Sequence, residues 1–164
     1  GHAGTLSPFA LVQEIREFWA GPLVLAGAIA NGRSILAARV LGADLAYVGS
    51  AFIATREANA SDAYKRAIVD AHAADIGYTN LFSGVHGNYL RSSIVAAGLD
   101  PDHLPESDPS KMSFGSDRVK PWRDIWGSGQ GVGAIHDVES VAELVARFRA
   151  EYDQALSALR GASR

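Results

Sequence analysis

The chain of 164 residues contains no cysteine. Disulfides, thiolate nucleophiles and cysteine-based metal sites are therefore excluded. The formal net charge is −3 and the pI is near 5.9. This balance lacks the positive footprint of proteins that bind nucleic acid or anionic membranes, so we expect neither as a partner. No apolar run reaches about 18 residues and no signal-peptide pattern is visible, so we expect a cytoplasmic protein.

The stretch from residue 22 to 52 has the pattern strand, turn, helix, strand, turn. Its first strand, Leu23–Ala26, is a short unbroken apolar run, which predicts a parallel strand buried on both faces. Apolar residues then recur at helical spacing over 35–41, and Leu45–Val48 forms the second strand. This order predicts a βαβ unit with a parallel sheet.

Each of these strands is followed by a glycine, Gly27 or Gly49, and Ser50 adds a hydroxyl at the second turn. Two such turns fit the site where a (β/α)8 barrel holds a phosphate between neighbouring loops. A doubly wound sheet would carry a GxGxxG turn after a strand, and this chain has none there. Small residues also occur at the turns of any βαβ unit, which is the structural alternative. A complete barrel needs about 250 residues, so 164 residues hold only part of one.

The chain begins with a glycine-flanked histidine, His2, in the loop Gly1–Gly4. Ser7 as N-cap and Pro8 as first helical residue then predict a helix. A histidine in a strand-to-helix loop of a barrel lies on the catalytic face. The alternative is a solvated histidine or part of a cloning remnant, as is common near a terminus.

The motifs GHAG, LAGAIANGRS, YVGSAF and WGSGQG occur in this order along the chain. Together they resemble the nitronate monooxygenase family, formerly called 2-nitropropane dioxygenases, which are FMN-dependent (β/α)8 barrels. The resemblance implies that His2 is the catalytic histidine and that no metal takes part. The cofactor-binding residues that it implies are Gly1, Gly27, Ala28, Tyr47, Val48, Gly49, Ser50 and Gln130.

The resemblance implies an α/β fold, namely the C-terminal part of a TIM barrel with an added helical and loop segment after the last strand. It implies oxidation of alkyl nitronates or nitroalkanes with O2, and an N-terminal half of the barrel that is missing or lies on another chain. A flavin-dependent enoyl-acyl-carrier-protein reductase has a similar Gly-Gly-His loop and similar turns, and it remains an alternative. A non-catalytic, truncated half-barrel is the alternative from another class.

Three segments are expected: barrel units over 1–54, a helical and loop excursion over 55–135, and a C-terminal docking helix within 136–164. His86, in the predicted loop 78–89, could line the substrate pocket, although a hydrogen-bonded structural histidine is favoured. The acidic residues between 100 and 108 match no Ca²⁺ loop and predict a solvated segment. The further elements expected are a helix over 60–74, a helix over 91–97, a long connection over 100–120, a tight turn over 122–135 and a last helix with Asp137 as N-cap.

Overall fold

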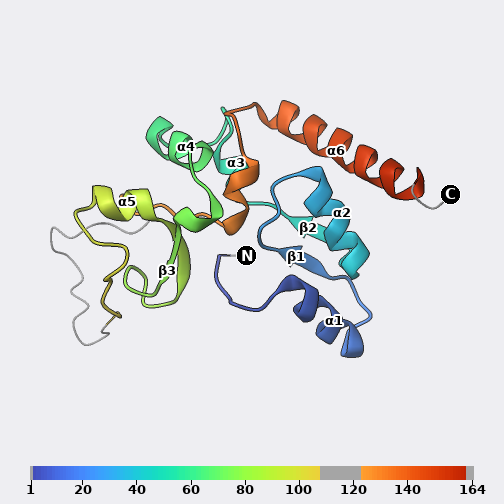
Figure 1. Cartoon of the computed structure of the whole chain (residues 1–164), viewed down its shortest axis with the longest axis horizontal. Helices are drawn as coiled ribbons and strands as arrows, with labels where there is room; N and C mark the ends of the chain where they lie inside the picture. Colours follow the sequence, from blue (N-terminus) through green and yellow to red (C-terminus); the bar gives the residue numbers. More distant parts are fainter. Residues whose placement is uncertain (1, 108–122, 162–164) are drawn as a thin grey trace.

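The computed structural model describes residues 2–107 and 123–161, which form two small sheets and the helices around them (Figure 1). The strands β1 (Val24–Ala26) and β2 (Leu45–Tyr47) are parallel and are joined by helix α2 (Gly32–Leu41). Val24 lies opposite Leu45 in the register of this pair. The predicted βαβ unit is confirmed.

The predicted start of α1 at Pro8 and the predicted end of α2 at Leu41 are confirmed. Helix α1 (Pro8–Phe18) starts with proline in its first turn, and the Ser7 hydroxyl accepts a hydrogen bond of 3.3 Å from the backbone N–H of Phe9. Helix α2 ends at Gly42, whose φ of 112° lies in the left-handed region. Glycine adopts that conformation without a Cβ penalty, which is why the helix stops there.

One face of the β1–β2 sheet is covered by α1 and α2. Leu25 points to this face and is buried in a cluster with Val12, Ile29, Ala38 and Ala43. The other face is open, because Val24 is 51% exposed, Leu45 is 61% exposed and Tyr47 is 67% exposed. The prediction that the first strand is buried on both faces is therefore wrong. Burial on two faces needs a second layer of protein, and only one is present in the described residues.

After β2 the chain forms short helices: α3 (Ser50–Ile53), α4 (Asp62–Val69) and the 3₁₀ turn η1 (Ala73–Asp75). The predicted helix over 60–74 is longer than the observed helix α4. The Ser61 hydroxyl caps α4 by accepting from the Tyr64 N–H, and the helix ends before the η1 turn.

The prediction of a loop over 78–89 is wrong at both ends of this stretch. Strand β3 (Ile76–Thr79) pairs antiparallel with β4 (Gly87–Leu90), and only the hairpin turn between them is irregular. The Leu90 N–H donates to the Trp126 carbonyl, and Tyr89 forms a bridge with Gly127. Residues 76–90 thus form a local hairpin whose second strand also contacts the distant segment 126–127, and the glycine-punctuated stretch 78–89 has no alternating pattern that would reveal it. The predicted helix after it is confirmed as α5 (Arg91–Ala96).

The last helix, α6 (Val141–Gly161), starts later than predicted. Asp137 is not its N-cap, because the Asp137 carboxylate accepts from the neighbouring Val138 N–H. Ser140 and Glu143 cap it instead: the Glu143 N–H donates to the Ser140 hydroxyl, and the Ser140 N–H donates to the Glu143 carboxylate. This reciprocal pair is a capping box, which satisfies two N–H groups at once.

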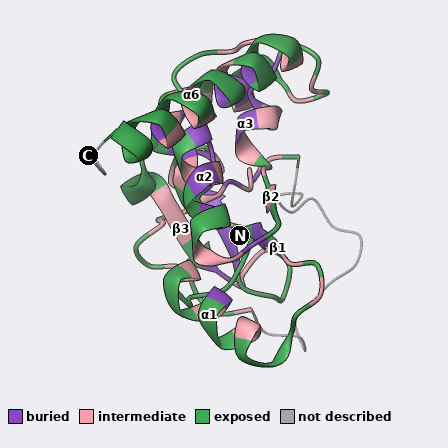
Figure 2. Ribbon diagram, turned by 90° about the vertical axis from the view of Figure 1, so that its right-hand side faces the viewer, coloured by how far each residue is buried: buried purple, intermediate pink, exposed green. Residues whose placement is uncertain are grey.

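The main core joins residues from all three predicted segments, so the segments pack on one another. Figure 2 shows the buried residues gathered on the inner sides of α2, α3 and α6, whereas much of α1 is exposed. The division into three segments stays a prediction. The buried members of this core are Ala30, Ala51, Ala54, Ile68, Ala71, Leu90, Val132, Ile135, Leu144 and Phe148.

The long connection predicted over 100–120 lies mostly outside the described residues. In its described part, Asp102 pairs with Arg91 at 2.6 Å and Asp100 pairs with the His103 ring at 2.7 Å. Over residues 2–107 and 123–161 there is no group of three histidine, aspartate or glutamate side chains placed to hold a metal ion. Within the same ranges, no helix combines the length and apolar composition that crossing a bilayer requires.

The contact between α2 and α6 supplies a prediction for stability. A Cβ added to Gly32 would fall on the backbone of Phe148 and Tyr152 in α6, so Gly32→Ala must push the helices apart. Overpacking of this kind lowers the free energy of unfolding by about 1–3 kcal/mol. Urea unfolding followed by circular dichroism measures it. Gly161→Ala, where a Cβ meets nothing within 4 Å, is the matched control with little loss expected, and equal stabilities would contradict the packing.

Candidate active site

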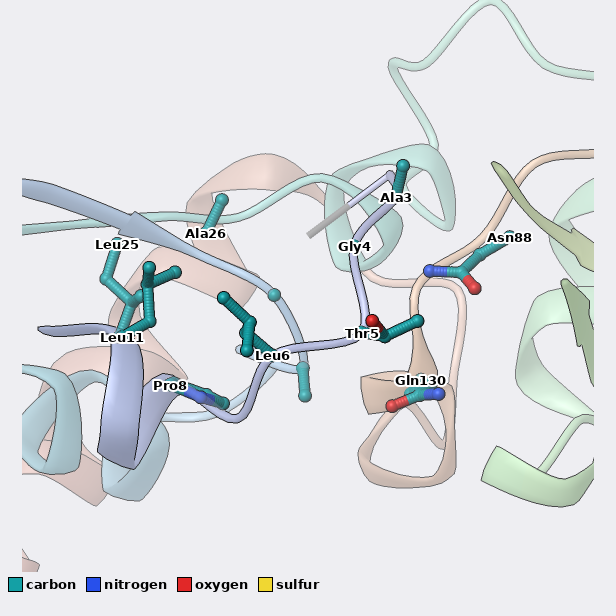
Figure 3. Close-up of a pocket in the computed structure, with 12 residues that line it drawn as sticks. Ala3, Gly4, Thr5, Leu6, Pro8, Leu11, Leu25, Ala26, Asn88 and Gln130 are labelled. Carbon is teal, nitrogen blue, oxygen red and sulfur yellow. The ribbon is translucent and has the colours of Figure 1, made fainter. Parts of the chain in front are cut away.

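A pocket of about 400 Å³ opens where the N-terminal segment passes the carboxyl end of β1. Figure 3 shows leucine side chains on one side of it and the amides of Asn88 and Gln130 on the other. Such a pocket can hold an apolar group at one end and bind polar atoms at the other. Its lining residues are Ala3, Gly4, Thr5, Leu6, Pro8, Leu11, Leu25, Ala26, Gly27, Ala28, Asn88 and Gln130.

Gly27 and Ala28, here called the first turn, follow β1 and line this pocket. Both have positive φ, 117° for Gly27 and 53° for Ala28. A left-handed conformation costs an alanine about 1–2 kcal/mol, so the fold holds Ala28 in a strained backbone conformation. Turns of this kind can expose successive backbone N–H groups, the feature that anion-binding turns use.

The second turn comprises residues 47–50 and follows β2. Tyr47 is exposed, Val48 packs partly against the core, and neither lines the pocket. A Cβ added to Gly49 would meet nothing within 4 Å, so open space adjoins the backbone there. The Ser50 hydroxyl accepts hydrogen bonds from the Gly129 N–H at 2.9 Å and from the Ser128 hydroxyl at 3.1 Å.

Residues 126–131, here called the bridging loop, connect the two turns. At one end the Ser50 hydroxyl anchors Ser128 and Gly129, and at the other end Gly131 packs on the first turn. A Cβ on Gly131 would lie 2.9 to 3.1 Å from backbone atoms of Ala28, so only glycine fits. The predicted tight turn against another backbone is thereby confirmed for its described part. Gln130, between these anchors, lines the pocket.

Aromatic stacking fixes the start of the bridging loop. Trp126 stacks on Tyr64 with 5.1 Å between ring centroids, and the Tyr64 hydroxyl donates to the Gly127 carbonyl. Burial raises the pKa of Tyr64 to about 12, so the hydroxyl keeps the proton that it donates. The backbone N–H of Trp126 also donates to the Ser93 hydroxyl at 3.0 Å. The bridging loop is therefore anchored by residues that do not themselves line the pocket.

His2 lies against strand β4 at the edge of the pocket. Its carbonyl accepts a hydrogen bond of 2.8 Å from the Asn88 N–H, and its ring meets Tyr89 edge-on with centroids 6.2 Å apart. The next residue, Ala3, lines the pocket, whereas His2 is exposed and does not. Gly1, the other predicted residue of this segment, lies outside the described residues.

A family model described as nitronate monooxygenase matches residues 1–151. The chain belongs to the nitronate monooxygenase family.

Curated relatives carry the same description. A nitronate monooxygenase of Paraburkholderia phytofirmans is 30% identical over an alignment that covers 98% of this chain and 48% of the relative. A probable nitronate monooxygenase of Bacillus subtilis is 34% identical, with 88% of this chain and 46% of the relative covered. The chain thus spans about half the length of the curated relatives it matches.

Solved structures share the fold. FabK from Thermotoga maritima superposes with a TM-score of 0.71 at 23% identity, covering 98% of this chain and 53% of FabK. Nitroalkane oxidase from Streptomyces ansochromogenes gives a TM-score of 0.67 at 25% identity, covering 94% of this chain and 46% of the oxidase. These matches are to TIM-barrel enzymes of which this chain covers about half, in agreement with part of a barrel.

The structure of this nitronate monooxygenase family member adds two residues that sequence reasoning missed. Asn88 is 5% exposed and lines the pocket, and Ser128 is 6% exposed and bonds to Ser50. The signal available for Asn88 was its place as a polar residue directly before the apolar pair Tyr89 and Leu90. Ser128 had no local signal, because its partner is distant in sequence.

His86 is exposed and stacks on Tyr78 with ring centroids 5.0 Å apart. It does not line the pocket. Tyr78 in turn accepts a hydrogen bond from the Gly4 N–H at 3.3 Å, so the pair supports the N-terminal segment from outside. The favoured structural role for His86 therefore agrees with its position, with ring stacking in place of the expected hydrogen bond.

Proposed function

We propose that this chain forms part of an FMN-dependent enzyme that oxidises alkyl nitronates or nitroalkanes with O2. The observation that carries the proposal is the bridging loop, which joins the two glycine-containing turns beside a pocket with both apolar and amide walls. The residues present fit a phosphate: the first turn has left-handed backbone, and the second turn adjoins open space at Gly49. FMN supplies the electron transfer when it is bound.

The chain's own residues take separate roles in this proposal. The N–H groups of the first turn, Gly27 and Ala28, and those of Gly49 and Ser50 hold the phosphate. Tyr47, Val48 and Gly1 border the cofactor by resemblance. Gln130 offers its amide to flavin or substrate as donor and acceptor. The apolar wall of the pocket excludes water from the reacting carbon.

His2 is the proposed base for nitroalkane substrates. The α-proton of a nitroalkane is acidic for a C–H group, and a neutral imidazole nitrogen can accept it, so histidine is a suitable residue type for this step. The backbone of His2 is tied to β4 through Asn88, which gives the ring a defined starting position at the pocket edge. A nitronate is already deprotonated and does not need this step.

The proposed partner is the other part of the barrel, carried by a longer form of this protein or by another chain. The open face of the β1–β2 sheet presents Val24, Ala26, Leu45 and Tyr47, which alternate with the residues facing the helices. In a closed barrel one set of alternating side chains fills the interior. The open face therefore has the character of an unfilled barrel interior.

The second candidate function is a flavin-dependent enoyl-acyl-carrier-protein reductase. The FabK fold match, with its TM-score of 0.71, is the observation that favours this alternative, and the two barrels have similar turns. Chemistry separates the two candidates: NAD(P)H bleaches the flavin of a reductase rapidly, whereas a nitronate bleaches the flavin of a monooxygenase without any nicotinamide. A non-catalytic half-barrel would respond to neither.

Gly49→Val tests the phosphate position. A Cβ at Gly49 meets no protein atom within 4 Å, so the variant should fold as the parent does. If phosphate occupies the open space, the valine side chain displaces it, and losing a charge-assisted hydrogen bond of about 1.5–3 kcal/mol lowers flavin affinity at least about tenfold. Flavin absorbance of the purified holoprotein is the measurement. Gly161→Val, where an added Cβ also meets nothing within 4 Å, is the control, and full flavin content in Gly49→Val would refute the assignment.

His2→Asn tests the base in the complete barrel. We expect flavin content to stay unchanged while kcat/KM for a neutral nitroalkane falls by about 10²–10⁴, the usual contribution of positioned proton transfer. Turnover of preformed nitronate should be largely spared. His103→Asn, whose side chain is 83% exposed, is the matched control. Equal losses for nitroalkane and nitronate would rule out a base role for His2.

Completing the barrel tests the proposed partner. The 164 residues alone should bind little FMN and show no turnover, because two parallel strands leave open edges and cannot enclose a cofactor. Supplying the other part of the barrel, in one chain or as a second chain, should restore both flavin binding and activity. Full activity of the isolated 164-residue monomer would overturn this proposal.

A further inference from the structure

We propose that the Ser50 hydroxyl couples phosphate binding at the second turn to the position of the bridging loop, and through it to the pocket. The inference rests on the proposed function, because it takes the second turn as part of the phosphate site. It assigns Ser50 a positioning role in addition to its predicted contact with the cofactor.

The Ser50 hydroxyl already accepts two hydrogen bonds, so what remains to it is to donate its proton. The oxygen accepts from the Gly129 N–H at 2.9 Å and from the Ser128 hydroxyl at 3.1 Å. A hydroxyl has two lone pairs and one proton, so both acceptor positions are used by the bridging loop. The proton is then available only for donation, and a phosphate oxygen at the second turn is an acceptor that meets this need.

Donation to a phosphate strengthens the two bonds that Ser50 accepts. When a hydroxyl donates to an anion, its oxygen becomes more negative, and hydrogen bonds in such chains strengthen one another by about 10–30% each. Both accepted bonds go to the bridging loop, and Ser128 is buried, so water does not replace them. Phosphate binding should therefore hold Ser128 and Gly129 more firmly.

The effect extends from the loop to the pocket through direct contacts. Gln130, directly after Gly129, lines the pocket, and Gly131 packs on Ala28 of the first turn. The Ser128 N–H donates to the Asn88 carbonyl at 3.1 Å, and the Asn88 N–H donates to the His2 carbonyl at 2.8 Å. A continuous series of hydrogen bonds thus links Ser50 to the backbone of His2.

Hydrogen exchange of the peptide over 126–135 in the complete flavoprotein tests this coupling. In the parent protein, FMN or inorganic phosphate should slow the exchange about fivefold or more, the lower end of typical couplings between sites. Ser50→Ala should lose this slowing at FMN concentrations that saturate the variant, and Ser50→Thr, which keeps a hydroxyl, should retain it. Equal slowing in Ser50→Ala and the parent would overturn the proposal.

Ser93→Ala is the matched control, because Ser93 anchors the same loop by accepting from the Trp126 N–H but lies away from both turns. It should raise exchange equally with and without FMN. Coupling is also reciprocal, so Ser128→Ala should weaken FMN binding about fivefold although Ser128 is not part of the phosphate site. Unchanged FMN affinity in Ser128→Ala contradicts the coupling even if Ser50→Ala does not fold.

The outcomes separate this inference from the proposed function. If the complete parent protein binds FMN but the exchange of 126–135 does not change, the coupling is wrong and the flavoenzyme proposal stands. If it binds neither FMN nor inorganic phosphate, both are wrong.

Discussion

Parallel pairing of β1 with β2 is the constraint on which the rest of the structure depends. Because parallel neighbours end at the same edge of a sheet, the first turn at Gly27 and the second turn at Gly49 lie close enough for one loop to contact both. The bridging loop does so through Gly131 at one turn and through the Ser50 hydroxyl at the other. The pocket and the proposed phosphate site follow from this edge.

One face of that sheet is packed on helices and the other is exposed. On the helical face, Leu25 is buried among residues of α1 and α2, and burial of such side chains contributes about 1.5–3 kcal/mol each. On the open face, Val24, Leu45 and Tyr47 remain more than half exposed. Apolar side chains gathered on one exposed sheet face are typical of a surface that further protein covers. The half-length match to relatives in the nitronate monooxygenase family and the open face favour the same explanation, a barrel completed by further strands.

The predictability of the proposed site differs from residue to residue. Gly27, Ala28 and Gln130 were expected near a ligand and do line the pocket, whereas residues 47–50 of the second turn lie outside it. Their proposed contact with a cofactor depends on a molecule that extends beyond the pocket to the second turn. Asn88 escaped prediction because the glycine-punctuated stretch that contains β4 has no alternating pattern, although β4 pairs with β3 and contacts the bridging loop.

The sequence by itself determined the βαβ unit, the helix ends next to it and the family. The caps at Ser7 and Gly42, the βαβ order and the motif series depend on neighbouring residues, and the structure and the family match agree with them. Only the tertiary structure decided which face of β1 is covered, that 78–89 begins and ends in strands, and that Ser50 holds Gly129. The covered face and the Ser50 contact depend on residues far apart in the chain, and such contacts leave no periodic or local signal in the residues that make them. The strands of 78–89 pair within one hairpin, but that stretch has no alternating pattern to show them.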